Sequence, residues 1–187
     1  MKSLALLAFP VLIGCGSTSI ASAPPSSTPP AAESSAAAPH GERTDRGWAK
    51  LATGCQDFTV VVSHASKRRF LVIRSSRSAL GLSKVGDSRT VAVSDSVRIL
   101  DLEIALYDSP GGDQHYCNDA VPADAPKKTG WLSAASGTVT IELTGLKSER
   151  DYTIDVTVSG VTIQNHGDLE TLPDATYSNV QVGWGPG

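Results

Sequence analysis

The most chemically crowded stretch of this 187-residue chain is residues 108–119, which read DSPGGDQHYCND. Asp108, Asp113 and Asp119 offer hard oxygen ligands, and the two adjacent glycines would let backbone carbonyls turn inward, so a Ca²⁺ loop is one interpretation. The other is a Pro-Gly-Gly turn at a strand end, where Asp and Asn cap their own backbone. The spacing lacks the alternating ligands and final Glu of an EF-hand loop. We therefore favour the turn, and no metal or other cofactor is predicted.

Elsewhere in the chain, few groups of residues have the types and spacing that catalysis needs. His64, His115 and His166 lie far apart, so a Zn²⁺ site would have to be gathered from distant segments. No Gly-x-Ser-x-Gly nucleophile motif is present. Asp101 and Glu103 alternate on one predicted strand about 7 Å apart, a spacing that could serve glycoside hydrolysis. Because alternating acids on a wet strand face are usually just solvated, we predict no catalytic residues, with a metal- or carboxylate-dependent hydrolase as the alternative.

Two tryptophans could contribute a ligand surface. Trp131 and Trp184 could stack on a sugar ring if both were exposed on one flat face. Trp184 keeps phase with Val180 and Val182, which favours core packing for it. Trp131 has no such pattern around it and is the candidate ligand-binding residue.

Charge narrows the class of partner. The chain carries 16 Lys and Arg against 19 Asp and Glu, a formal net charge of −3. The basic clusters 67–69 and 127–128 lie between predicted strands, where charges solubilise turns or protect sheet edges. Without a broad cationic field, nucleic acid is not expected as a partner.

The elements that must position these residues are strands. Apolar residues recur with a period of two, most clearly in 97–107, 138–144 and 152–159, and no long window outside the N-terminus shows a helical period. Earlier strands are indicated around 58–62, 70–72 and 91–93, and a last one at 177–184. A single helical turn fits 76–85, and a bulge or turn is expected at Gly160, where the phase of the apolar residues changes. The fold class predicted is all-β, an antiparallel two-sheet β-sandwich of Greek-key or immunoglobulin-like type with about seven to nine strands.

The N-terminus resembles an export signal. Lys2 precedes an apolar run at 4–13 that is too short to span a bilayer. The four residues Leu12-Ile13-Gly14-Cys15 that follow resemble the lipobox of bacterial lipoproteins. That resemblance implies cleavage before Cys15, lipidation of its thiol and a lipid anchor in the bacterial cell envelope. Because Gly16 rather than Asp follows, it also implies the outer membrane in a Gram-negative cell. The alternative is an ordinary secretory signal cut near residues 21–23.

The segment after Cys15 is poor in residues that can form a core. Of the 24 residues 16–39, 22 are Ser, Ala, Pro, Thr or Gly, so we expect a disordered tether. The predicted organisation is therefore a signal peptide at 1–14, an anchor and tether at 15–47, and a β-domain at 48–187.

Three cysteines then divide into one anchor and one pair. With Cys15 lipidated, Cys55 and Cys117 are expected to form a disulfide in an oxidising compartment, the alternatives being two free thiols or a metal pair. Closing the loop between Cys55 and Cys117 would stabilise the folded domain by roughly 4 kcal/mol on the chain-entropy model. The function expected is a non-enzymatic binding or structural module on an envelope lipoprotein, with an unidentified envelope protein or glycan as partner. A Ca²⁺-stabilised adhesion domain or a carbohydrate-binding domain is a further alternative.

Overall fold

The computed structural model describes residues 47–93, 99–118, 120–165 and 167–183. The lipobox with Cys15 and the tether lie outside these residues, as do Asp119, His166 and Trp184. Within the described part, no helix is both long enough and apolar enough to cross a bilayer.

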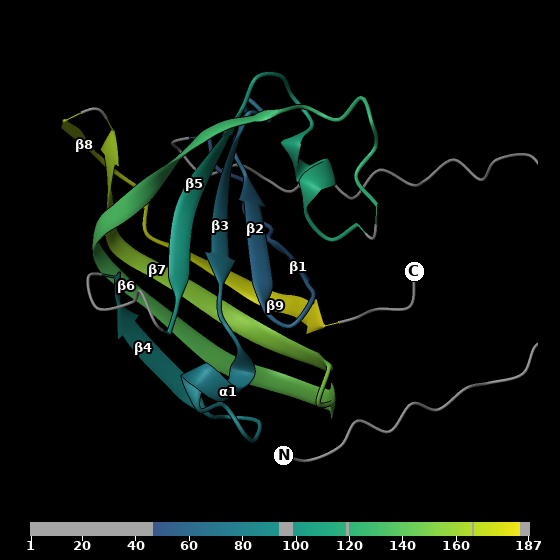
Figure 1. Ribbon diagram of the computed structural model, residues 1–187. Coiled ribbons are helices and arrows are strands. Elements are labelled where there is room, and N and C mark those ends of the chain that lie inside the picture. The colour runs from purple at the N-terminus through teal and green to yellow at the C-terminus, as the bar shows by residue number, and fades with distance from the viewer. Residues whose placement is uncertain (1–46, 94–98, 119, 166, 184–187) are drawn as a thin grey trace, which may run out of the picture. The chain divides into compact units, whose positions relative to one another are not determined.

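The described chain is built almost entirely of antiparallel strands (Figure 1). In chain order they are β1 (Thr53–Cys55), β2 (Thr59–Ser63), β3 (Arg69–Arg74), β4 (Ser88–Ala92), β5 (Asp101–Tyr107), β6 (Lys128–Ser148), β7 (Asp151–Asn165), β8 (Asp168–Thr171) and β9 (Ala175–Gly183). One short helix, α1 (Arg77–Leu80), lies between β3 and β4, and a 3₁₀ turn, Gly112–His115, lies between β5 and β6. The predicted all-β class and the single helical turn are confirmed.

Strand β6 joins two halves of one sheet. The hydrogen-bonded order is β1-β2-β3-β5-β6-β7-β8, with β4 also pairing with β6 and β9 with β7. The start of β6 pairs with β5, and its later residues pair with β4 and β7. We call β1, β2, β3, β5 and the start of β6 the first half, and the rest the second half. In Figure 1 the upright strands of the first half cross in front of the diagonal strands of the second.

The expectation of two separate sheets is not confirmed, because all nine described strands belong to one hydrogen-bonded sheet. The physical reason is the 21-residue length of β6, which serves both halves. Alternation of apolar residues reports which side of a strand is buried, but it does not report which partners the strand has along its length.

Two glycines lie at an irregularity in the pairing of β6 with β7. Ser136 pairs with Thr162 and Thr138 pairs with Ser159, so β7 carries one extra residue at this point. Gly160 there has a φ of +58°, which confirms the predicted bulge. Opposite it, Gly137 has a φ of +111°, and a Cβ on it would lie 2.5 Å from the Cα of Val161. Only glycine fits such a close approach of two backbones.

The main core lies between the two halves. It is made almost wholly of aliphatic side chains, including Val60, Val62, Leu71, Ile73, Leu102, Ile104, Val139, Ile141, Leu143, Ile154, Val156 and Val158. Helix α1 closes one end of it through Leu80 and is capped by the hydroxyl of Ser76, which accepts from the backbone N–H of Ala79. The low aromatic content of the chain is therefore offset by dense Val, Ile and Leu packing.

A second buried layer covers the outer face of the first half. Val61, Phe70, Val72, Ala105 and Tyr107 form a separate cluster, with Tyr116 packed against it. This corrects the expectation that the alternate face of 97–107 is wet. The reason is the long β5–β6 connection, residues 108–127, which contributes Tyr116 and shields that face from water.

Candidate functional site

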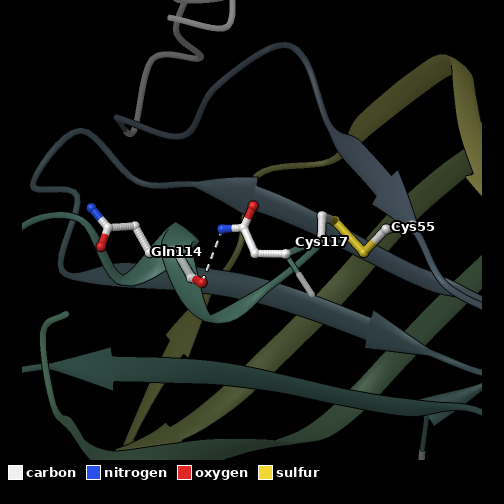
Figure 2. Close-up of a disulfide and its surroundings, with 4 residues drawn as sticks. Cys55, Gln114 and Cys117 are labelled. Atoms are coloured by element: carbon white, nitrogen blue, oxygen red, sulfur yellow. Dashed lines mark hydrogen bonds between the residues drawn. A yellow bond between two sulfur atoms is a disulfide. The ribbon is translucent and has the colours of Figure 1, made fainter. Parts of the chain in front are cut away.

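The β5–β6 connection is fixed to the sheet by a disulfide. Cys55 at the end of β1 is bonded to Cys117 in the connection, which confirms the predicted pair (Figure 2). Close to the bridge, the side-chain amide of Asn118 donates to the backbone carbonyl of Gln114 over 3.0 Å. The covalent link holds the connection over the outer face of the first half.

Aromatic contacts hold the same connection against the sheet. The hydroxyl of Tyr107 donates to that of Tyr116 over 3.1 Å, and the ring of Phe70 packs edge-on against Tyr107. Burial, reinforced by the hydrogen bond to Tyr116, raises the pKa of Tyr107 well above its ordinary value. Gly112 lies directly on the Tyr107 ring, where a Cβ would collide with it. These contacts bury the face beneath the connection and pack the connection against it.

The aspartates that were weighed as calcium ligands lie in turns where they are described. The Oδ1 atom of Asp108 accepts from the backbone N–H of Lys127 at 2.9 Å and from the hydroxyl of Ser109 at 3.1 Å. Asp113 lies in the first turn of the 3₁₀ segment, and Asp119 is outside the described residues. In the described part of the chain, no three His, Cys, Asp or Glu side chains come close enough to hold a metal ion.

A network of charged side chains crosses three strands beside this connection. Glu103 on β5 is only 8% exposed. Its Oε1 accepts from Arg74 Nη1 of β3 at 3.1 Å and from Lys128 Nζ of β6 at 2.9 Å. Arg74 Nη1 also donates to Asp101 Oδ2 at 3.2 Å. The two predicted carboxylates therefore share one guanidinium, and the buried one is not merely solvated.

The charges in this network stabilise one another. Partial burial works against the charge on Arg74, but the hydrogen bond and the negative charge of Glu103 outweigh it and raise the pKa of the guanidinium. Arg74 also lies 5.8 Å from the centre of the Tyr116 ring, so the network contacts the disulfide-bound connection. Two cations and two carboxylates leave the group with no net charge.

Trp131 lies at the exposed end of this network. It pairs in register with Ala105 of β5, which puts its side chain on the same outer face as Glu103. The residue is 63% exposed, and Lys128 Nζ lies 5.6 Å from the centre of its ring. We call Arg74, Asp101, Glu103, Lys128 and Trp131 together the Trp131 face.

The edge of β6 next to Trp131 is open in the described structure. Residues 128–133 pair with β5, whereas pairing with β7 on the other edge begins at Ala134. Trp131 is thus at the margin of the first half, where a large ligand can approach it without displacing a described strand.

The two described histidines and an apolar depression beside Trp48 have less to offer a ligand. His64 Nδ1 lies 3.0 Å from the Ser66 hydroxyl, with its ring edge against Trp48, and His115 stacks on Tyr107 and donates to the carbonyl of Pro126. A depression lined by Trp48, Leu71, Val158, Leu172, Pro173 and Tyr177 encloses about 190 Å³ even with open solvent included. Ligand pockets usually exceed about 300 Å³.

The outer face of the second half carries hydroxyl groups. Thr90, Thr140, Thr157 and Thr176 stand in one row across four strands. They pair with one another, at 2.8 Å for Thr90 and Thr140 and 3.0 Å for Thr157 and Thr176. Threonine is common on solvated strand faces, and this row contains no charged or aromatic group.

Comparison with protein-family models, with curated proteins and with solved structures gives no match to this chain. The site is therefore defined by its geometry alone. Of its members, sequence reasoning named Trp131 as a ligand candidate and weighed Asp101 and Glu103, but missed the roles of Arg74 and Lys128. The sequence did contain a signal that the outer face of the first half is buried. Residues 60–62 and 70–73 are continuous apolar runs, which indicate strands buried on both faces.

Proposed function

We propose that this chain is a lipid-anchored protein of the bacterial cell envelope whose β-domain is a non-enzymatic binding module, and that the Trp131 face is its binding surface. The observation that carries the proposal is a tryptophan that is 63% exposed at the end of an ion network centred on the buried Glu103. Tryptophan and arginine are the residues most often responsible for binding energy at interfaces.

The support beneath Trp131 favours binding. Glu103, Arg74 and Lys128 tie three neighbouring strands together, and the Cys55–Cys117 bridge holds the adjoining connection in place. A binding side chain on regular strands, held by a second layer of contacts, loses little conformational entropy when a ligand arrives.

The location proposed for the protein depends on two features. Leu12-Ile13-Gly14-Cys15 resembles a lipobox, and a disulfide between Cys55 and Cys117 suits an oxidising compartment outside the cytoplasm. A lipid on Cys15 would hold the domain near a membrane, with the Ser/Ala/Pro-rich segment after it as the spacer.

Lipidation is tested by detergent partition of the full chain. The wild-type protein is expected in the detergent phase and the Cys15→Ala variant in the aqueous phase. If both variants partition alike, the proposed anchor is wrong.

Binding is tested with the full-length Cys15→Ala chain, so that the lipid does not mask the domain. We expect this chain to cosediment with washed cell envelopes, and Trp131→Ala in the same background to reduce the bound fraction severalfold. Leu169→Ala is the matched control, because Leu169 is 67% exposed and lies on β8. Equal retention of all three chains would refute a binding role for the Trp131 face.

A further inference from the structure

The Trp131 face combines an aromatic surface with adjacent hydrogen-bonding groups of both kinds. Trp131 supplies the indole ring, Lys128 supplies donors, and the exposed carboxylate of Asp101 supplies acceptors. We propose that its ligand is a neutral glycan built of pyranose rings with equatorial hydroxyls, one ring of which stacks on Trp131. This inference rests on the binding function proposed above and names the ligand class.

The stacking argument comes from the electrostatics of the indole ring. The face of an aromatic ring is electron-rich. A pyranose whose hydroxyls are all equatorial presents C–H groups, which are apolar and weakly positive, from both of its faces. An axial hydroxyl would disturb that contact on one face. Trp131 is exposed enough to accept a flat ring, and Lys128 at 5.6 Å from its centre restrains the indole by a cation–π contact.

The hydrogen-bonding argument comes from the layout of the network. Sugar hydroxyls both donate and accept, so they need partners of both kinds close to the stacked ring. Lys128 carries three donors, of which Glu103 takes one in the described structure. Asp101, with a side chain 63% exposed, offers its carboxylate to a ligand while remaining bound to Arg74. The network crosses β3, β5 and β6, or about 10 Å at ordinary strand spacing, which leaves room for more than one sugar unit.

The charge argument decides between neutral and charged polymers. Arg74 and Lys128 are balanced by Asp101 and Glu103, so the face offers no net attraction to a polyanion or a polycation. An anionic ligand that recruited Lys128 would have to compete with Glu103, a carboxylate that is nine-tenths buried and would lose a partner. A neutral glycan can bind without breaking any of these ion pairs.

The open edge of β6 at 128–133 suggests an extended peptide as the competing ligand. Strand addition would use backbone groups and would not need the ion network or a stacked indole. The glycan is favoured because it uses the aromatic ring, the donors and the acceptors together.

The test is calorimetric titration of the detergent-solubilised full chain with cellohexaose and with N-acetylchitohexaose. At least one is expected to bind saturably, and Trp131→Ala to weaken that binding tenfold or more, whereas Trp131→Phe should retain part of it. Leu169→Ala should bind as wild type does, and heparin should not bind at physiological salt. Circular dichroism of each variant checks that the fold is intact.

Three results would overturn the inference. If neither oligosaccharide binds while Trp131→Ala still reduces envelope retention, the module binds a different class of ligand and the proposed function stands. Salt-sensitive binding of heparin that Trp131→Ala weakens would show that the face selects polyanions instead. Oligosaccharide binding that is unchanged in Trp131→Ala would place the sugar elsewhere on the protein.

Discussion

Replacing Glu103 by glutamine should destabilise the domain much more than replacing its neighbour Asp101 by asparagine. The Glu103 side chain is 10% exposed and accepts two charge-assisted hydrogen bonds, at 3.1 Å from Arg74 and 2.9 Å from Lys128. Glutamine keeps the size and one acceptor oxygen but loses the charge, which roughly halves the strength of each bond. At about 1 kcal/mol lost per bond, the sum is about 2 kcal/mol.

Two effects reduce this loss of stability. Arg74 and Lys128 are 38% and 36% exposed, so water screens the charges left behind and the loss stays below the ~3–5 kcal/mol of a fully buried pair. Glutamine also removes the cost of burying a carboxylate. We therefore expect Glu103→Gln to cost about 1 to 2 kcal/mol. For Asp101→Asn, whose side chain is 63% exposed, we expect less than about 0.5 kcal/mol.

The assay is urea unfolding of the full chain, followed by circular dichroism. The Glu103→Gln midpoint should move to lower urea with an unchanged slope, because the surface exposed on unfolding is the same. In a thermal scan the same loss corresponds to roughly 3 to 8 °C for a domain of this size. If the two variants lie within about 0.5 kcal/mol of each other, Glu103 is not the buried centre of the network, and the rigid support argued for Trp131 fails with it.

Three further predictions concern the fold. Cys55→Ser should lower the free energy of unfolding by up to about 4 kcal/mol, because the bridge closes a loop across a sequence separation of 62, and a reductant should have the same effect on the wild type but none on the variant. Gly137→Ala should lower the free energy of unfolding in urea more than Gly167→Ala does. Both glycines have positive φ, but an added Cβ meets the backbone of Val161 at position 137 and nothing within 4 Å at position 167. Equal losses of stability would mean that φ alone matters. Burial raises the pKa of Tyr177 to about 12, so between about pH 10 and 12 this tyrosine ionises in the unfolded chain before it does in the folded one. The free energy of unfolding should therefore fall as pH rises through that window. From pH 8 to pH 11.5 the Tyr177→Phe variant should lose less stability than the wild type, and an identical loss would contradict the argument.

The strands were predictable because their signal is local. Alternation of apolar and polar residues at 138–144 and 152–159 follows from the two-residue repeat of a strand with one buried side, and both segments lie inside longer observed strands. Gly160 could be identified as a bulge for the same reason, since an extra residue shifts the phase of the pattern. Cys55 and Cys117 could be paired by counting, once Cys15 was assigned to the anchor.

The candidate site was less predictable because its members come from separate strands. Trp131 was chosen because Trp184 keeps phase with core residues, but its 63% exposure and its contact with Lys128 are visible only in the fold. Asp101 and Glu103 occupy equivalent positions in the alternating pattern, yet one is exposed and the other buried. Asp101 begins β5, whereas Glu103 lies within the strand and contacts both Arg74 and Lys128, which are 29 and 25 residues away along the chain.

The sequence by itself determined the all-β class and indicated the cysteine pair, the bulge and the short helical turn, because each depends on local periodicity, backbone freedom or a residue count. Only the tertiary structure decided that one long strand unites the two halves of the sheet, and that a disulfide-bound connection buries the second face of the first half. It also decided that a buried carboxylate joins two cations beneath an exposed tryptophan. Pairing partners, burial and charge contacts are relations between distant residues, and they are set by how the whole chain packs.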